Sequence, residues 1–173
     1  MSDQIILHID MDCFYVSCER LRDPDLIDQP VIVGMNYIPG ESRGAVATAS
    51  YEARALGIES AMNISKVLSI LPDTELNPSS EPSCYYRSAD KNFYREISQS
   101  VRDLLENFSD VTRHVSIDEA YLDVTNKTTW NSSVKFSQSL GILLIPLGPF
   151  VISVVFFKIN LIISAIPMVA IAR

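Results

Sequence analysis

Hydrophobic and polar positions alternate along the chain in a pattern that predicts an α+β fold. Residues 4–10, "QIILHID", form an apolar run that ends in an acid and predicts a buried strand. Residues 88–109 carry apolar side chains at helical spacing and predict a long amphipathic helix. Residues 111–125, "VTRHVSIDEAYLDVT", predict one or two strands joined at Asp118 and Glu119. With the shorter elements between them, this order indicates a sheet with helices on one face.

The segment between the first strand and the long helix predicts a small α/β insert. Its expected elements are a helix at 12–23, a strand at 30–34, a strand that becomes a helix at 44–57, and a helix at 63–72. Asp12 is a candidate N-cap for the first helix, and Asn63 or Ser65 for the last. Gly57 is expected to close the helix that it follows.

Length and composition predict one intracellular domain of ordinary size, or one domain with a small appendage. The 173 residues carry a net charge of −7, which taken alone argues against a nucleic-acid partner. The three cysteines, Cys13, Cys18 and Cys84, lack metal-type spacing and indicate reduced thiols. The N-terminal stretch has acids where a secretory signal has basic residues. We therefore expect a cytoplasmic protein.

The charge is distributed unevenly, and this sets the last fifty residues apart. The first 123 residues hold all 21 acidic and 10 of the basic residues, a net charge of −11, whereas the remainder has four basic residues and no acid. Residues 140–157 contain no charge, and their length makes 140–172 a candidate membrane segment. Pro146 and Pro149 weaken a helix there, so we do not favour an anchor. The alternative for the tail 126–173 is a shifted frame or a splice product.

Acidic side chains gather at the predicted strand ends. Asp10 and Asp12 follow the first strand, and Asp118 and Glu119 interrupt the last strands. If these strands are neighbours, the carboxylates repel one another unless a divalent cation lies among them. Oxygen ligands without His or Cys suit Mg²⁺ or Mn²⁺ and argue against Zn²⁺. Such clusters serve two-metal phosphoryl transfer, although each acid could instead be a cap or turn residue.

Two further groups of residues leave alternatives open. In "ATASYEAR", Thr48, Tyr51 and Arg54 offer a hydroxyl, a phenol and a guanidinium that suit a polyphosphate. The same letters fit a small-residue strand with a core tyrosine and a solvated arginine. Phe14 and Tyr15 could pack against a sugar or base, or belong to the core.

Five stretches in this order resemble the Y-family translesion DNA polymerases of the DNA polymerase IV group. They are "IDMDCFYVSCE", "PVIVG", "GAVATASYEARALGI", "AMNISKVLSILPD" and "VSIDEAYLDVT", and they cover roughly Ile5 to Thr125. The resemblance implies a partial polymerase palm, with a ferredoxin-like sheet and helices on one face, and a small α/β fingers insert. The expected segments are palm at 1–25 and 81–125, fingers at 26–80, and an unrelated apolar C-terminal tail at 126–173.

The resemblance also implies a metal site. Asp10 and Asp118 would bind both catalytic Mg²⁺ ions, for which Mn²⁺ could substitute. The Met11 carbonyl would complete the nucleotide-side site, and Glu119 would complete the primer-side site. Asp12 belongs to the same motif without being an assured ligand.

Nucleotide contacts follow from the same resemblance. Tyr15 matches the steric gate, the aromatic residue that excludes a ribose 2′-hydroxyl, and Phe14 would line the same pocket. Cys13 stands where many relatives have an aromatic residue, a change that we expect to be neutral. Three positions match the triphosphate contacts: Thr48, Tyr51 and Arg54.

The implied function is template-directed nucleotidyl transfer onto a DNA primer 3′-end, in translesion synthesis and DNA repair. Its partners would be a dNTP and, weakly, primer–template DNA. We expect impaired activity, because nothing after Asn126 resembles the thumb and little-finger domains. The alternative is a catalytically inactive membrane-tethered or degenerate fragment. A two-metal nucleotide cyclase is less favoured, since "SYEAR" and "CFY" suit the polymerase.

Overall fold

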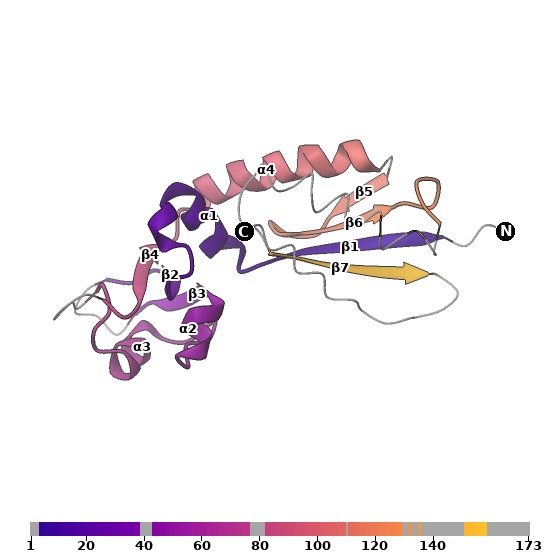
Figure 1. Cartoon of the computed structure of the whole chain (residues 1–173). Coiled ribbons are helices and arrows are strands. Elements are labelled where there is room, and N and C mark those ends of the chain that lie inside the picture. The colour runs from indigo at the N-terminus through magenta and orange to yellow at the C-terminus, as the bar shows by residue number, and fades with distance from the viewer. Residues whose placement is uncertain are drawn as a thin grey trace. The chain divides into compact units, whose positions relative to one another are not determined.

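The structure is a computed structural model of the whole chain. It describes residues 4–38, 43–76, 82–109, 111–129, 132, 135 and, by their backbone, 151–158. The chain forms two compact units (Figure 1). Unit 1 comprises Met1–Asp12 and Asn92–Arg173, and unit 2 comprises Cys13–Lys91.

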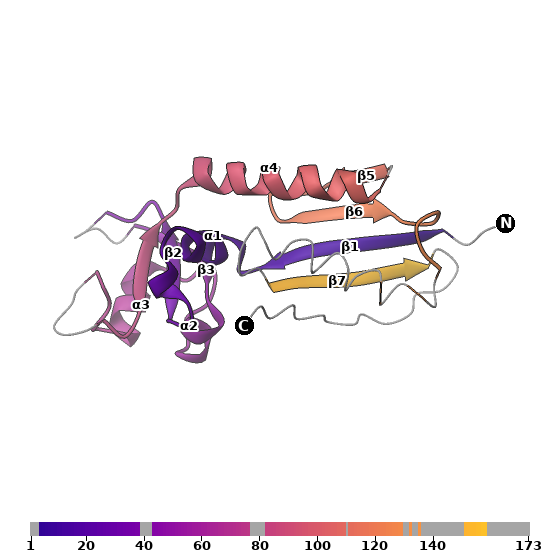
Figure 2. The same cartoon turned by 45° about the horizontal axis from the view of Figure 1, so that its top comes forward.

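Unit 1 is a four-stranded antiparallel sheet with one long helix. The strand order is β5-β6-β1-β7. The strands are β1 (Ile5–Asp12), β5 (Val111–His114), β6 (Glu119–Asp123) and β7 (Val151–Lys158), and the helix is α4 (Lys91–Phe108). Helix α4 lies along one face of this sheet in both views (Figure 1, Figure 2). The predicted α+β architecture with a helix on one face is therefore confirmed.

Alternating burial explains which face of β1 meets the core. Its odd-numbered residues, from Ile5 to Met11, are buried, and its even-numbered residues, from Ile6 to Asp12, are half-buried. This period of two places Asp10 and Asp12 on the face opposite the buried positions. Helix α4 buries a stripe at helical spacing: Tyr94, Ser98, Val101 and Leu105.

Strand β7 lies in the tail that we expected to be unrelated to the fold. It pairs antiparallel with β1 from Ile5 opposite Lys158 to Asp12 opposite Val151. The β-branched residues of this segment suit a strand, and β1 offers them a row of backbone donors and acceptors. Within the candidate membrane segment 140–172, which we did not favour, residues 151–158 form a strand and not a helix, and the rest of the segment lies outside the described residues. Within the described part of the chain, no helix is both long and apolar enough to cross a bilayer.

Unit 2 is a three-stranded sheet, in the order β3-β2-β4, with three short α-helices. Strand β2 (Val31–Met35) pairs antiparallel with β3 (Ala45–Ala49) and parallel with β4 (Tyr85–Ser88). The helices are α1 (Phe14–Arg22), α2 (Tyr51–Ala55) and α3 (Ile64–Ile70), with a 3₁₀ turn, η1, at Pro24–Leu26. Their shared core includes Ile32, Val46, Ile58, Ile64 and Val67.

The predicted helix caps are partly correct. Asn63 caps α3, since its Oδ1 accepts a hydrogen bond from the Ser65 backbone N–H at 2.8 Å. Asp12 does not cap α1, because it is still part of β1. The N-cap is Cys13, whose left-handed backbone (φ 50°) turns the chain from strand to helix without a side-chain cap.

The boundaries of the two compact units differ from the boundaries of the palm and fingers segments expected from the sequence. The divisions fall after Asp12 and after Lys91, not after residues 25 and 80. Helix α1 belongs to unit 2 because Arg20 on it binds the carbonyls of Leu26 and Gln29. Strand β4 belongs there because it completes the sheet beside β2.

Candidate functional site

The first part of the candidate site is a pair of facing acids in unit 1. Asp10 of β1 lies directly opposite Glu119 of β6. Burial raises the pKa of Asp10 from 3.8 to about 6, helped by a hydrogen bond with the Glu119 carboxyl and by the negative charges of Asp118, Asp12 and Glu119. These two strands are therefore neighbours, which is the condition on which the expected cluster of carboxylates depended. They concentrate negative charge at one point of the sheet.

Asp118 is held by the turn that leads into β6. The Ser116 hydroxyl donates to Asp118 Oδ1 at 2.6 Å, and the Asp118 backbone N–H donates to the Ser116 Oγ at 3.3 Å. The Met11 N–H donates to the Asp118 carbonyl at 3.1 Å, which fixes the turn against the end of β1. One carboxylate oxygen of Asp118 is thus committed to Ser116.

Helix α4 anchors the same turn from its buried face. The Ser98 hydroxyl donates to the Ile117 carbonyl at 2.6 Å, and Arg102 Nη2 donates to the Ser116 carbonyl at 2.8 Å. The cavity between this turn and α4 measures about 10 Å³, enough for about one water molecule at most.

The donor chemistry of this cluster fits a hard divalent cation. Asp10, Asp118 and Glu119 offer carboxylate oxygens, the ligands that Mg²⁺ and Mn²⁺ prefer. The raised pKa of Asp10 identifies a point where a positive charge would relieve repulsion. Among the described residues, however, no three His, Cys, Asp or Glu side chains are arranged to hold a metal ion. Asp10 and Glu119 bond to each other, and Asp118 bonds to Ser116.

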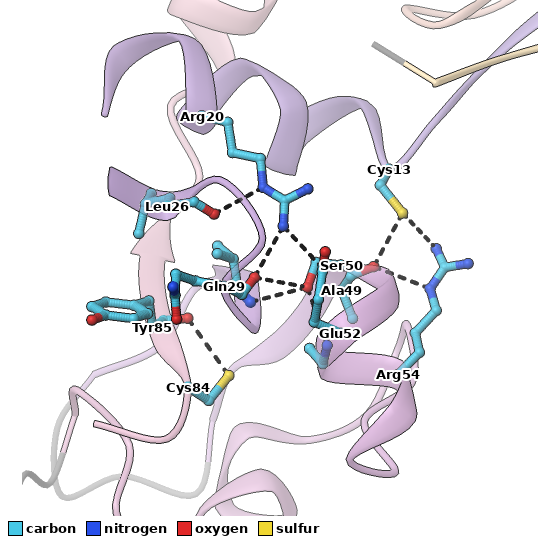
Figure 3. Close-up of polar contacts among 12 residues, drawn as sticks. Cys13, Arg20, Leu26, Gln29, Ala49, Ser50, Glu52, Arg54, Cys84 and Tyr85 are labelled. Carbon is cyan, nitrogen blue, oxygen red and sulfur yellow. Dashed lines mark hydrogen bonds and ion pairs between the residues drawn. The ribbon is translucent and has the colours of Figure 1, made fainter. Parts of the chain in front are cut away.

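The second part of the candidate site is Arg54 in unit 2. Its Nε donates to the Ala49 carbonyl at 3.0 Å, and its guanidinium carbon lies 5.1 Å from the centre of the Tyr51 ring. Both side chains are exposed. Ser50 caps the five-residue helix α2, since its Oγ accepts from the Ala53 N–H at 3.1 Å. Figure 3 shows Arg54 beside the end of β3.

A half-buried ion pair joins helix α2 to α1. Arg20 Nη2 binds the Glu52 carboxylate at 2.9 Å (Figure 3). Burial alone would raise the pKa of Glu52, but hydrogen bonds from Ser50, from its own backbone and from Arg20 outweigh it and lower that pKa. The two helices that carry the candidate nucleotide residues are thereby held together within unit 2.

The remaining candidate nucleotide residues also lie in unit 2. Phe14 is buried, with 2% of its surface exposed, and Tyr15 beside it is half-buried. Their ring centres are 6.0 Å apart. Thr48 is half-buried in β3, opposite Val33. Burial of Phe14 agrees with the core alternative, whereas Tyr15 and Thr48 present part of their side chains at the surface.

Sequence reasoning missed the residues that hold the candidate groups in place. Ser116 lies two residues before Asp118, a spacing at which a hydroxyl commonly bonds the local backbone, so a signal was present. No sequence pattern indicated the roles of Ser98 and Arg102, because their hydrogen bonds to the turn form only when α4 packs against it. Cys13, expected to be neutral, contacts Arg54.

Comparison with known proteins gives consistent matches. Residues 9–144 match the model of the impB/mucB/samB family, past Thr125, where we expected the resemblance to end. DNA polymerase IV of Halobacterium salinarum (strain ATCC 29341 / DSM 671 / R1) is 49% identical over 138 residues, 80% of this chain and 34% of that protein. DNA polymerase IV of Methanoculleus marisnigri is 42% identical over 123 residues, 71% of this chain and 31% of that protein. The chain thus spans about a third of the length of these curated relatives.

Solved structures agree with these sequence matches. The crystal structure of DinB from Sulfolobus solfataricus is 30% identical, with a TM-score of 0.75, over 88% of this chain and 42% of that one. The insertion ternary complex of Dbh DNA polymerase is 30% identical, with a TM-score of 0.74, over 87% of this chain and 42% of that one. At these values the likeness extends to the fold of most of the chain.

Proposed function

Because the chain belongs to the impB/mucB/samB family of Y-family DNA polymerases, we propose that it transfers a nucleotide from a dNTP to a DNA primer 3′-end in translesion synthesis. The observation that carries the proposal is the facing pair Asp10 and Glu119, with Asp118 adjacent in the chain. Three acids gathered at the ends of neighbouring strands suit a metal-assisted reaction of a polyphosphate.

Unit 1 would act as the palm and hold the metal ions. Asp10, Asp118, Glu119 and the Met11 carbonyl are the proposed ligands of two Mg²⁺ ions, with Mn²⁺ as a substitute. When bound, such ions neutralise charge on the phosphates and acidify the primer hydroxyl. Ser116 supports this role, because it occupies one oxygen of Asp118 and orients the other.

Unit 2 would act as the fingers and hold the incoming nucleotide. Arg54, Tyr51 and Thr48 would bind the triphosphate, with Arg54 suited to paired hydrogen bonds to phosphate oxygens. Tyr15, half-buried next to the buried Phe14, would stack under the sugar and exclude a 2′-hydroxyl. The exposure of these side chains supports the assignments, which come from the family resemblance: Tyr51 and Arg54 are exposed, and Tyr15 and Thr48 are half-buried.

The reaction would be an in-line displacement at the α-phosphate. The primer 3′-oxygen forms a bond to the α-phosphorus and loses its proton to solvent. The bond from that phosphorus to the bridging oxygen breaks, and pyrophosphate leaves. The contribution of the chain is positioning and charge stabilisation.

The test is insertion of one nucleotide into a primer–template under single-turnover conditions, with the chain in excess over DNA. We expect extension by one nucleotide that requires Mg²⁺ or Mn²⁺ and a base complementary to the template. Asp118→Asn should remove the extension, while Asp25→Asn, which alters an exposed acid in η1, should retain it. Extension that is unchanged in Asp118→Asn would refute the proposed function.

A further inference from the structure

Two neighbouring nitrogens of the Arg54 guanidinium donate hydrogen bonds within unit 2. Nε donates to the Ala49 carbonyl at 3.0 Å, and Nη2 donates to Cys13 Sγ at 3.2 Å. The thiol in turn donates to the same Ala49 carbonyl at 3.2 Å. Figure 3 shows this closed arrangement of thiol, carbonyl and guanidinium within unit 2.

The two contacts of Cys13 require a small side chain that can both donate and accept a hydrogen bond. A thiol has one S–H and lone pairs on sulfur, so it can donate to Ala49 and accept from Arg54 at once. Cys13 also has a left-handed backbone (φ 50°), the conformation that directs its side chain from the start of α1. A phenylalanine at this position has no side-chain donor or acceptor and could make neither hydrogen bond.

The contacts matter because Arg54 is otherwise a long, exposed side chain. An exposed arginine loses rotamer freedom when it binds a ligand, and that loss weakens binding. Holding Nε and Nη2 beforehand removes much of this cost and leaves other N–H groups of the guanidinium for a ligand. The Tyr51 ring restrains the same guanidinium on one face.

We propose that Cys13 is a positioning residue of the nucleotide site, whose thiol preorganises Arg54 for the triphosphate of an incoming dNTP. This inference rests on the proposed function and adds a residue to it. Cys13 acts through Arg54 and does not itself touch the nucleotide by its side chain. Its substitution therefore changes affinity only while Arg54 is present.

The test is a double-mutant cycle on the binding of dATP with Mg²⁺, measured by calorimetry on the whole chain. Cys13→Ala should raise the Kd about five-fold, the usual effect of losing one hydrogen bond. Cys13→Ser keeps a donor and an acceptor and should recover part of the loss. In an Arg54→Ala background, Cys13→Ala should have no further effect. Equal effects of Cys13→Ala in both backgrounds would overturn the proposal.

Alkylation of the wild-type chain provides a second measurement, in which the protein folds before Cys13 is modified. Cys18 and Cys84 are fully buried, and burial raises the pKa of each thiol to about 12, so iodoacetamide should select the half-buried Cys13. The modified chain should bind dATP more weakly, and Cys13→Ser treated identically should be unaffected. Unchanged affinity after complete Cys13 alkylation would also overturn the proposal.

The outcomes separate this inference from the function on which it rests. If Arg54→Ala weakens dATP binding but Cys13→Ala does not, the role of Cys13 is wrong and the nucleotide site stands. If the wild-type chain does not bind dATP, or Arg54→Ala binds it as tightly, the proposed nucleotide site is wrong and the role of Cys13 falls with it.

Discussion

Asp10 of β1 and Glu119 of β6 lie opposite each other in the sheet, and their carboxyl groups share a hydrogen bond. Two carboxyls at this separation share a proton or require a cation, since two full negative charges would repel. The same relationship therefore predicts a pH-dependent stability and a divalent-ion site.

Asp10→Asn should change how stability depends on pH. A carboxyl whose pKa is raised in the folded state binds more protons there than in the unfolded state. Its contribution to stability is complete below pH 3.8 and is lost as the pH rises through about 6. Asp10→Asn should thus raise the Tm relative to wild type at pH 7.5 and alter it little at pH 4, as measured by thermal unfolding. Parallel Tm profiles for the two proteins over this range would contradict the assignment.

Ser116→Ala should weaken metal binding without a large loss of stability. The substitution frees the Asp118 carboxylate from the hydroxyl that orients it. Loss of a group that orients a metal ligand costs roughly ten-fold or more in metal affinity. Titration with Mn²⁺ measures the effect. Ser100→Ala is the matched control, because Ser100 is exposed on α4 and its hydroxyl donates to the Glu96 carbonyl of the same helix. Equal affinities for the two variants would refute this role of Ser116.

Tyr15→Ala should relax the choice of sugar. If the ring of Tyr15 excludes the 2′-hydroxyl, its removal should raise the ratio of ATP to dATP insertion by roughly ten-fold or more. Tyr15→Phe keeps the ring and should retain discrimination. Single-nucleotide insertion with each substrate measures the ratio, and equal ratios in Tyr15→Ala and wild type would exclude a steric gate at this position.

Gly34→Ala should destabilise unit 2 through a clash with Tyr86. A Cβ at Gly34 would lie 2.7 Å from the Tyr86 hydroxyl oxygen and nearer to the ring, which also packs against Tyr37. Overpacking of this kind costs about 1–3 kcal/mol in the free energy of unfolding. In a Tyr86→Ala background the same substitution should cost much less. Urea unfolding gives both values, and a full cost in both backgrounds would exclude the clash.

The sequence was sufficient for the parts of the fold that local patterns determine. The apolar run before Asp10 and the pattern around Glu119 indicated the positions of their strands, whereas the pairing of these strands was an assumption that the structure confirms. The spacing of apolar residues in 88–109 predicted helix α4, but it did not single out Tyr94 and Ser98, which are among its buried residues.

Features that depend on the partner surface were not predictable in this way. Strand β7 was assigned to an apolar tail, since composition alone does not reveal that β1 has an edge for it to pair with. Asp12 was wrong as a cap because the strand continues through it. The contact of Cys13 with Arg54 joins residues 41 positions apart and arises only when α1 and α2 pack together.

The central claim is that Asp10, Asp118 and Glu119 form a divalent-ion site. Its most direct test is titration of the whole chain with Mn²⁺, in which electron paramagnetic resonance measures the free ion. The account predicts saturable binding that Mg²⁺ displaces, that Asp10→Asn and Asp118→Asn each abolish, and that Asp25→Asn preserves. Wild-type Mn²⁺ affinity in both Asp10→Asn and Asp118→Asn would contradict it.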